Sequence, residues 1–522
     1  MDHTEQRHHG GNGDGRRSPP SSKIPYRELR GCSVSTVVMC FVAALTMIGS
    51  PANGADSMSL VQAVKSGDAA MFRVLLKQRV DVNAAEPDGT TALHWAVQRN
   101  DLDTADLLIR GGANVRAANR YGIAPLQVAA TNGSAPMIEK LLAAGADPNT
   151  ATPGGETALM TAARTGNAQA VSLLLAHGAN VNATESWRRQ TALMWAAAEN
   201  NAAVVKLLVE AGADLKARSK GGALTPLLFA VRGGHIEATR VLLDSGMDVN
   251  QRMPDGTSPL LLAIINAHYE LAGFLLDRGA DPNADGKGWT ALHQVVWSRR
   301  PNTGFNLPGP VATGNLSSLD LVKKLLEFGA DVNARQKKEP KDGYRNQLNR
   351  IGATPFLLAA KSVDLPLMRV LLEYGADPTI TTEDHTTALM AAAGVGIWAP
   401  GENPGTDEEA LAALKLAFTV GSGGVNDVDD NGETALLGAI YRAGSIAMAK
   451  FLIEKGAKLD VRNKKGWTPL IVADGVEYTP NVLKRYPETA AFLRQVFAER
   501  GLAVPPPLES PPTNRGTVES EQ

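Results

Sequence analysis

The residue types that most often act in catalysis are present, but their spacing does not predict an active site. Four histidines of the central region lack the short spacings of zinc ligands: His177, His235, His268 and His385. The chain has neither a glycine-rich lysine loop for phosphate nor a Gly-x-Ser-x-Gly nucleophile motif. The acidic run from Asp407 to Glu409 could bind a cation, but a place at a helix N-terminus explains it more simply. We therefore expect no catalytic residue, no metal and no cofactor.

Composition limits the classes of protein to consider. The chain has 522 residues, 44% of them hydrophobic and 20% charged, with a net charge of −2. It is longer than one ordinary domain of about 100–200 residues, and it has enough apolar residues to exclude global disorder. The small net charge gives no general attraction to nucleic acid, so we expect no nucleic-acid partner. The only two cysteines, Cys32 and Cys40, lie near the N-terminus, so the rest of the chain can form no disulfide.

The N-terminal segment has the order of features that is typical of a secretory signal peptide. Arginines precede an apolar run from Val34 to Ile48, and helix-breaking and small residues follow it. The run is shorter than the roughly 20 residues needed to cross a bilayer. We expect residues 1–55 to be removed after Gly54 or Ala55, which leaves a periplasmic or secreted protein with no other membrane contact. An uncleaved anchor at 34–48 and a start codon assigned too far upstream are the alternatives.

Most of the chain is an internal repeat, and two series of residues share its period. A Thr-Ala-Leu or Thr-Pro-Leu motif, or a variant of it with one residue changed, recurs along the chain. Its spacing is at first 32 to 34 residues and becomes less regular after an interruption. Its apolar residue lies at Leu93, Leu126, Leu159, Leu193, Leu227, Leu260, Leu292, Phe356, Leu389, Leu436 and Leu470. A glycine that closes an apolar helix recurs in phase with it, at Gly112, Gly145, Gly178, Gly212, Gly246, Gly279, Gly329, Gly375 and Gly456. This regularity predicts one solenoid of stacked units.

The motif resembles the unit of the ankyrin repeat family. Thr91-Ala92-Leu93-His94 matches the start of that unit, and Gly329-Ala330-Asp331-Val332-Asn333-Ala334 matches its end. The resemblance implies an all-α repeat solenoid of helix-turn-helix units joined by β-hairpin fingers, with about eleven units plus caps. It extends over residues from about 57 to about 475.

The chemistry of the motif explains why each unit folds. The threonine caps the first helix of the unit, because its hydroxyl can accept from a free N–H of the first turn. The glycine ends the second helix in a left-handed conformation. Paired alanines such as Ala129-Ala130 keep the first helix slim, so that neighbouring units can stack.

These patterns divide the chain into five segments. After the signal segment 1–55 we expect a capping repeat at 56–88, the repeat array at 89–475, a C-terminal capping segment at 476–503 and a disordered, proline-rich tail at 504–522.

Three insertions interrupt the array, at 298–317, 335–351 and 396–406. The third ends in Thr406-Asp407-Glu408-Glu409, a capping box that starts the next helix. Insertions extend the loops of a solenoid without disturbing its stack. Their clustering favours a specialised surface between residues 298 and 408, and tolerated drift is the alternative.

Ankyrin repeats bind partners through finger tips and the concave side of the first helices, and this resemblance supplies candidate contact residues. The tips contain Arg120, Tyr121, Trp187, Arg188 and Arg189, the first helices contain Trp297, Tyr441 and Arg442, and the third insertion contains Trp398. Tryptophan, tyrosine and arginine are the usual anchors of interfaces. Arg189 occupies a position where the family has glycine. For any single one of these residues, plain packing or solvation is the alternative reading.

Together these features predict a bacterial, exported, non-catalytic scaffold. It would bind an as yet unidentified protein partner and would be a monomer. The alternative is a binder of a glycan, cofactor or other small ligand, in a pocket formed by the insertions around Trp297 and Trp398.

Overall fold

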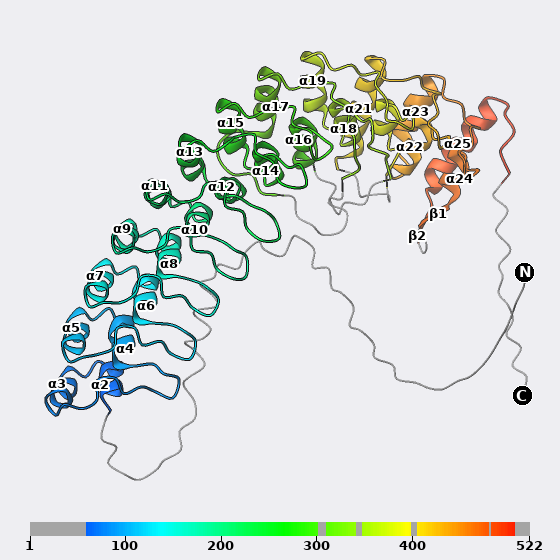
Figure 1. Cartoon of the computed structure of the whole chain (residues 1–522). Coiled ribbons are helices and arrows are strands. Elements are labelled where there is room, and N and C mark those ends of the chain that lie inside the picture. The colour runs from blue at the N-terminus through cyan, green and yellow to red at the C-terminus, as the bar shows by residue number, and fades with distance from the viewer. Residues whose placement is uncertain (1–58, 301–309, 341–346, 398–403, 480–481, 507–522) are drawn as a thin grey trace, which may run out of the picture. The chain divides into compact units, whose positions relative to one another are not determined.

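The computed structural model describes residues 59–300, 310–340, 347–397, 404–479 and 482–506 (Figure 1). The predicted signal segment, Trp398 and the tail from residue 507 onward lie outside these ranges. The described residues belong to one unit that begins at Ser59. None of its helices has both the length and the hydropathy that a membrane crossing requires.

The unit is a stack of helix pairs in chain order (Figure 1). The first helices of the pairs form an inner row beside the fingers: α2 (Leu60–Ser66), α4 (Ala92–Gln98), α6 (Pro125–Thr131), α8 (Ala158–Thr165), α10 (Ala192–Ala198), α12 (Pro226–Gly233), α14 (Pro259–Ile265), α16 (Ala291–Arg299), α18 (Pro355–Lys361), α20 (Ala388–Ala393), α22 (Ala435–Tyr441) and α24 (Pro469–Asp474). The second helices form an outer row: α3 (Ala69–Lys77), α5 (Leu102–Arg110), α7 (Ala135–Ala143), α9 (Ala168–Ala176), α11 (Ala202–Glu210), α13 (Ile236–Asp244), α15 (Tyr269–Asp277), α17 (Ser318–Glu327), α19 (Leu365–Glu373), α21 (Asp407–Thr419), α23 (Ile446–Glu454) and α25 (Pro487–Glu499).

The core runs through the stack between the two rows. Each inner helix packs on the inner helix before it and the one after it, as α10 does on α8 and α12. The paired alanines make this contact possible, and Ala129, Ala130, Ala162 and Ala163 are all fully buried. Because one unit cannot cover its own apolar face, the stability of each repeat depends on its neighbours.

The first turn of the inner helices is capped in two ways. The hydroxyl of the capping threonine accepts from the N–H three residues on, as Thr354 does from Leu357 at 3.3 Å. In α4 and α16 a histidine completes the cap, because His94 Nδ1 accepts from the Thr91 N–H at 3.1 Å and His293 Nδ1 from the Thr290 N–H at 3.3 Å. A glutamine takes this role in α6.

A ladder of asparagines joins consecutive repeats along the ends of the outer helices. The Asn83 side chain donates to the Gly112 carbonyl at 3.1 Å and accepts from the Asn114 N–H at 2.7 Å, both in the next unit. The same link recurs across the insertions, where Asn283 donates to the Gly329 carbonyl at 2.8 Å. The stack therefore continues through this part of the array.

The fingers are loops closed by turns rather than regular hairpins. In the described fingers, β-bridges form only between Ala85 and Thr91 and between Ala151 and Thr157. Regular strands appear in the described residues only after α24, where β1 (Val476–Thr479) pairs antiparallel with β2 (Val482–Lys484). The repeat pattern has already decayed there, and this hairpin was not predicted.

The insertions are anchored to the array and to each other. At the start of the first, Arg299 forms a two-point ion pair with Asp364 and Arg300 donates to Glu409 at 2.6 Å. The second contacts the third through the Gln347 N–H, which donates to the Gly396 carbonyl at 3.1 Å. The third ends at the predicted capping box, in which the Thr406 hydroxyl accepts from the Glu409 N–H.

Candidate functional site

The finger before α10 presents an exposed indole on a fixed backbone. Trp187 is 81% exposed. The buried carboxylate of Glu185 accepts from the N–H of Trp187 at 2.6 Å, of Arg188 at 2.8 Å and of Gln190 at 2.9 Å. In other fingers a shorter asparagine or aspartate side chain plays this part, as Asn119 does. The finger can therefore offer Trp187, Arg188 and Arg189 to a partner without ordering its backbone first.

Arg189 holds a conformation that favours glycine. Its φ is +53°, and the equivalent position two residues before the cap is a glycine with positive φ in most other fingers, as at Gly155 and Gly256. The exceptions besides Arg189 are Ala223 and His385. A side chain in the left-handed region carries strain of about 1–2 kcal/mol. The backbone at Arg189 is thus left-handed, which is the conformation that the glycine of other fingers adopts at this position.

Arg120 and Tyr121 form a separate exposed pair on the finger before α6. Tyr121 is 50% exposed, and the Arg120 guanidinium lies 4.8 Å from the centroid of its ring. The finger before α8 separates this pair from Trp187. The two predicted tip clusters are therefore on the same row of fingers, but they do not touch.

The structure does not place the inner-helix candidates on an open surface. Tyr441 is 7% exposed and Arg442 is 5% exposed. Arg442 donates to the Pro404 carbonyl at 2.7 Å, so the third insertion covers the end of α22. Burial lowers the pKa of Arg442 to about 10. The expectation that both side chains face solvent is wrong, because it assumed an uninterrupted array.

Trp297 is half-buried rather than free for a partner. Its ring lies 5.5 Å from that of Trp289, and the Arg350 guanidinium of the second insertion stacks over it at 5.1 Å. Trp398, its predicted companion, is outside the described residues. The predicted pocket around Trp297 and Trp398 therefore stays a prediction.

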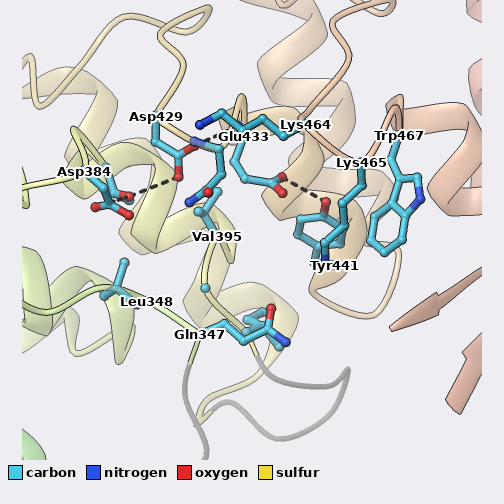
Figure 2. Close-up of a pocket in the computed structure, with 14 residues that line it drawn as sticks. Gln347, Leu348, Asp384, Val395, Asp429, Glu433, Tyr441, Lys464, Lys465 and Trp467 are labelled. Atoms are coloured by element: carbon cyan, nitrogen blue, oxygen red, sulfur yellow. Dashed lines mark hydrogen bonds between the residues drawn. The ribbon is translucent and has the colours of Figure 1, made fainter. Parts of the chain in front are cut away.

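A cavity of about 220 Å³ does lie near the insertions, but it is built from different residues (Figure 2). The fingers before α20, α22 and α24 supply one side, and the second and third insertions supply the other. Its lining includes Asp384, Asp429, Glu433, Tyr441, Lys464, Lys465, Trp467, Gln347, Leu348 and Gly396. Figure 2 shows the carboxylates on the finger side and Gln347 and Leu348 across from them.

The carboxylates of the cavity are held by neutral donors. Glu433 accepts from the Tyr441 hydroxyl at 2.9 Å and from the Asn463 amide at 2.8 Å. Asp429 accepts from the Thr386 hydroxyl at 3.2 Å and from backbone N–H groups. Burial raises the pKa of both Glu433 and Asp429. Burial thus disfavours the charged forms of these carboxyls, and a donor or a cation placed in the cavity would stabilise them.

Within the described ranges, no three histidine, cysteine, aspartate or glutamate side chains lie close enough together to hold an ion. Sequence reasoning missed Asp384, Asp429, Glu433 and Trp467 as a site. Each occupies an ordinary finger position, and only the packing of the insertions against the fingers turns these positions into a cavity.

Comparisons with known proteins decide the family. The family model described as "Ankyrin repeats (3 copies)" matches residues 60–152, 126–219 and 218–286, and the model described as "Ankyrin repeat" matches 287–337 and 431–464. These matches cover more than half of the chain. The chain belongs to the ankyrin repeat family. The predicted all-α repeat solenoid is confirmed.

Two individual proteins show the extent of the likeness. The array is 31% identical over 140 residues to "Protein lin-12" of Caenorhabditis elegans, a match that covers 26% of this chain and 8% of that protein. It also resembles the crystal structure of the human ASB11 ankyrin repeat domain, at 27% identity and a TM-score of 0.39, over 43% of this chain and 98% of that one. Ankyrin repeats typically mediate protein–protein interaction, and proteins built from them are generally scaffolds without enzyme activity.

Proposed function

We propose that this ankyrin array is a non-catalytic scaffold that binds a protein partner through its finger tips. The observation that carries the proposal is Trp187, whose side chain is 81% exposed although its backbone is fixed by Glu185. A tryptophan offers a large contact area with little loss of side-chain entropy, which is why it anchors interfaces. Arg188 and Arg189 follow it in the chain and add hydrogen-bond donors.

A photo-crosslinking experiment tests this proposal on the full chain. Benzoylphenylalanine replaces Trp187 in one variant and Phe328 in a matched control, because Phe328 is also exposed, at 44%, but lies at the end of the outer helix α17. We expect illumination in producing cells to link a defined protein to position 187 and not to position 328. Equal crosslinking at both positions, or none at position 187, would contradict a partner site at the finger tips.

A second candidate function concerns the cavity. We propose that it can bind a small glycan unit, because carboxylates and aromatic rings at one site are suited to hydroxyl groups and sugar faces. Its volume of about 220 Å³ lies below the roughly 300–1,000 Å³ of most ligand pockets, which disfavours a large cofactor. Calorimetry tests this with D-glucose and, as a cationic probe, L-arginine. Binding of D-glucose should release heat with the parent chain, and the Glu433→Gln variant should give no such heat. Heat from neither compound, or from L-arginine alone, would rule this candidate out.

We also propose that the chain is an exported bacterial monomer whose residues 1–55 are removed after Gly54 or Ala55. The order of basic, apolar and small residues at the N-terminus supports export. The N-terminal residue and the sedimentation mass of the protein recovered from the periplasm test both points. An intact Met1, or a dimer mass, would contradict the corresponding part of the proposal.

A further inference from the structure

Three consecutive fingers and the inner helices beside them carry seven basic side chains that form no ion pair within the described residues, although one of them, Arg252, lies near enough to Asp285 of the next finger to lower the pKa of that carboxyl. We call this set the basic finger surface: Arg164, Arg188, Arg189, Arg218, Lys220, Arg232 and Arg252. All of them except the half-buried Arg164 are exposed. None forms an ion pair with any residue that the structure describes. Glu199, at the end of α10 between Arg164 and Arg232, pairs with neither.

The outer face of the same repeats differs in this respect. There Arg240 pairs with Glu237 at 3.4 Å and Arg278 with Asp244 at 2.5 Å. Lys287 of the next finger pairs at 3.0 Å with Asp255, which lies on the same finger as Arg252, so the unpaired surface ends at that finger. Within these repeats the unpaired basic charge therefore lies on the finger side, although the chain as a whole has a net charge of −2.

The members of the basic finger surface are neighbours in space. The Lys220 N–H donates to the Arg188 carbonyl at 2.7 Å, which joins the fingers before α12 and α10. The pKa of Arg232, at the end of α12, is lowered by its partial enclosure and by repulsion from Arg188. The inner helices α8, α10, α12 and α14 pack in sequence, and packed helices are about 8–10 Å apart. The surface therefore extends over a few repeat spacings, with Trp187 on it.

Aromatic rings rather than carboxylates accompany two of these cations. The Arg164 guanidinium lies 5.2 Å from the ring of Trp195, and that of Arg232 lies 5.0 Å from the ring of Phe229. Their hydrogen-bond donors remain available to an incoming acceptor. Arg189 adds a positive charge at a position where glycine would be unstrained. Strain of this kind at an exposed basic residue indicates a role in binding.

We propose that the basic finger surface binds a short acidic segment of the protein partner, with the segment's aspartate and glutamate side chains on the arginines and an apolar residue on Trp187. The inference rests on the proposed function and names the partner's chemistry. A peptide fits better than a nucleic acid or an anionic membrane. The surface is short, contains an exposed indole and gives way to paired charges at Lys287.

Fluorescence anisotropy with the full chain tests the proposal. The probe is a labelled twelve-residue peptide of alternating glutamate and leucine, and the matched probe has glutamine in place of glutamate. We expect binding of the acidic peptide only, with about tenfold weaker affinity in the Arg188→Gln/Arg232→Gln double variant. Arg189→Gly should also weaken binding, and because it relieves backbone strain the loss cannot be attributed to unfolding. Lys206→Gln on the outer helix α11 is the control and should bind as the parent chain does.

Each other outcome overturns the inference. Equal affinity for the two peptides, or unchanged affinity in the arginine variants, would show that the charges do not select the partner. Tighter binding of oligo-dT, or of phosphatidylserine vesicles, would assign the surface to a nucleic acid or a membrane. A partner crosslinked at position 187 while the acidic peptide fails to bind would leave the proposed function standing and this inference refuted. Failure of both experiments would refute both.

Discussion

The Asp364→Ala variant is expected to lose about 3–5 kcal/mol of stability in the repeats around α18 and α19. Asp364 is 1% exposed and Arg299, its partner, is 14% exposed. The guanidinium donates through Nε at 2.7 Å and through Nη2 at 3.2 Å, one bond to each carboxylate oxygen. Removal of the carboxylate leaves the arginine largely buried without its counter-charge. It also removes the cap that Asp364 provides to the Leu367 N–H.

Two control variants separate these contributions. Asp364→Asn keeps a capping oxygen and removes the charge together with one of the two hydrogen bonds from Arg299. Asp474→Ala breaks the exposed pair with Arg494, which is worth about 0–1 kcal/mol. Urea unfolding should be combined with hydrogen exchange at α18 and α19, because a repeat array need not unfold in one step. If Asp364→Ala is no more damaging than Asp474→Ala, this ion pair does not fasten the first insertion to the array.

Acid should destabilise the array through His293, and His293→Gln should remove that part of the effect. His293 is fully buried, and burial lowers its pKa to about 4 although Asp331 acts in the opposite direction. Its Nδ1 accepts from the Thr290 N–H, so Nε2 carries the proton and donates to the Ala353 carbonyl at 3.1 Å. Protonation of Nδ1 would destroy this cap and place a charge in the core.

The sign follows from the difference between the folded and unfolded states. The unfolded chain takes up a proton on His293 near pH 6.5, whereas the folded chain does so only near pH 4. Stability is therefore complete above about pH 6.5 and falls as the pH drops towards 4, by about 3 kcal/mol in total. Buried carboxyls such as Glu433, whose pKa is raised, have the opposite slope. The difference between the parent chain and the variant isolates the histidine.

The chain itself supplies the model for this substitution. In α6, Gln127 Oε1 accepts from the Ala124 N–H at 2.6 Å and its amide donates to the Thr150 carbonyl at 3.0 Å, which is the pattern that His293 makes. His293→Gln should therefore fold and keep its stability between pH 6.5 and 4 better than the parent. Urea midpoints measured at pH 7.5, 5.5 and 4.5 check this. If the urea midpoints of the parent and the variant fall by the same amount as the pH is lowered, protonation of His293 does not cause the predicted loss of stability.

The repeat architecture could be read from the sequence because its signals are local. A threonine cap such as Thr354, the alanine pair of α6 and the closing glycines each specify the conformation of a few neighbouring residues. Repetition at one period then determines which faces meet, because each unit contacts only the next. The capping box at Thr406 could be predicted for the same reason, whereas only the resemblance to the ankyrin unit marked Arg189 as a residue in a glycine position.

Only the tertiary structure shows which residues the insertions contact and cover. Arg300 donates a hydrogen bond to Glu409, which is 109 residues further along the chain, and Arg442 donates one to the carbonyl of Pro404. Such contacts depend on how irregular segments pack on a surface, and no period in the sequence encodes that. Tyr441 and Arg442 are therefore buried although a regular array would expose them, and ordinary finger carboxylates line a cavity. Local propensities specify the stack, whereas burial at the insertions arises from packing between distant segments.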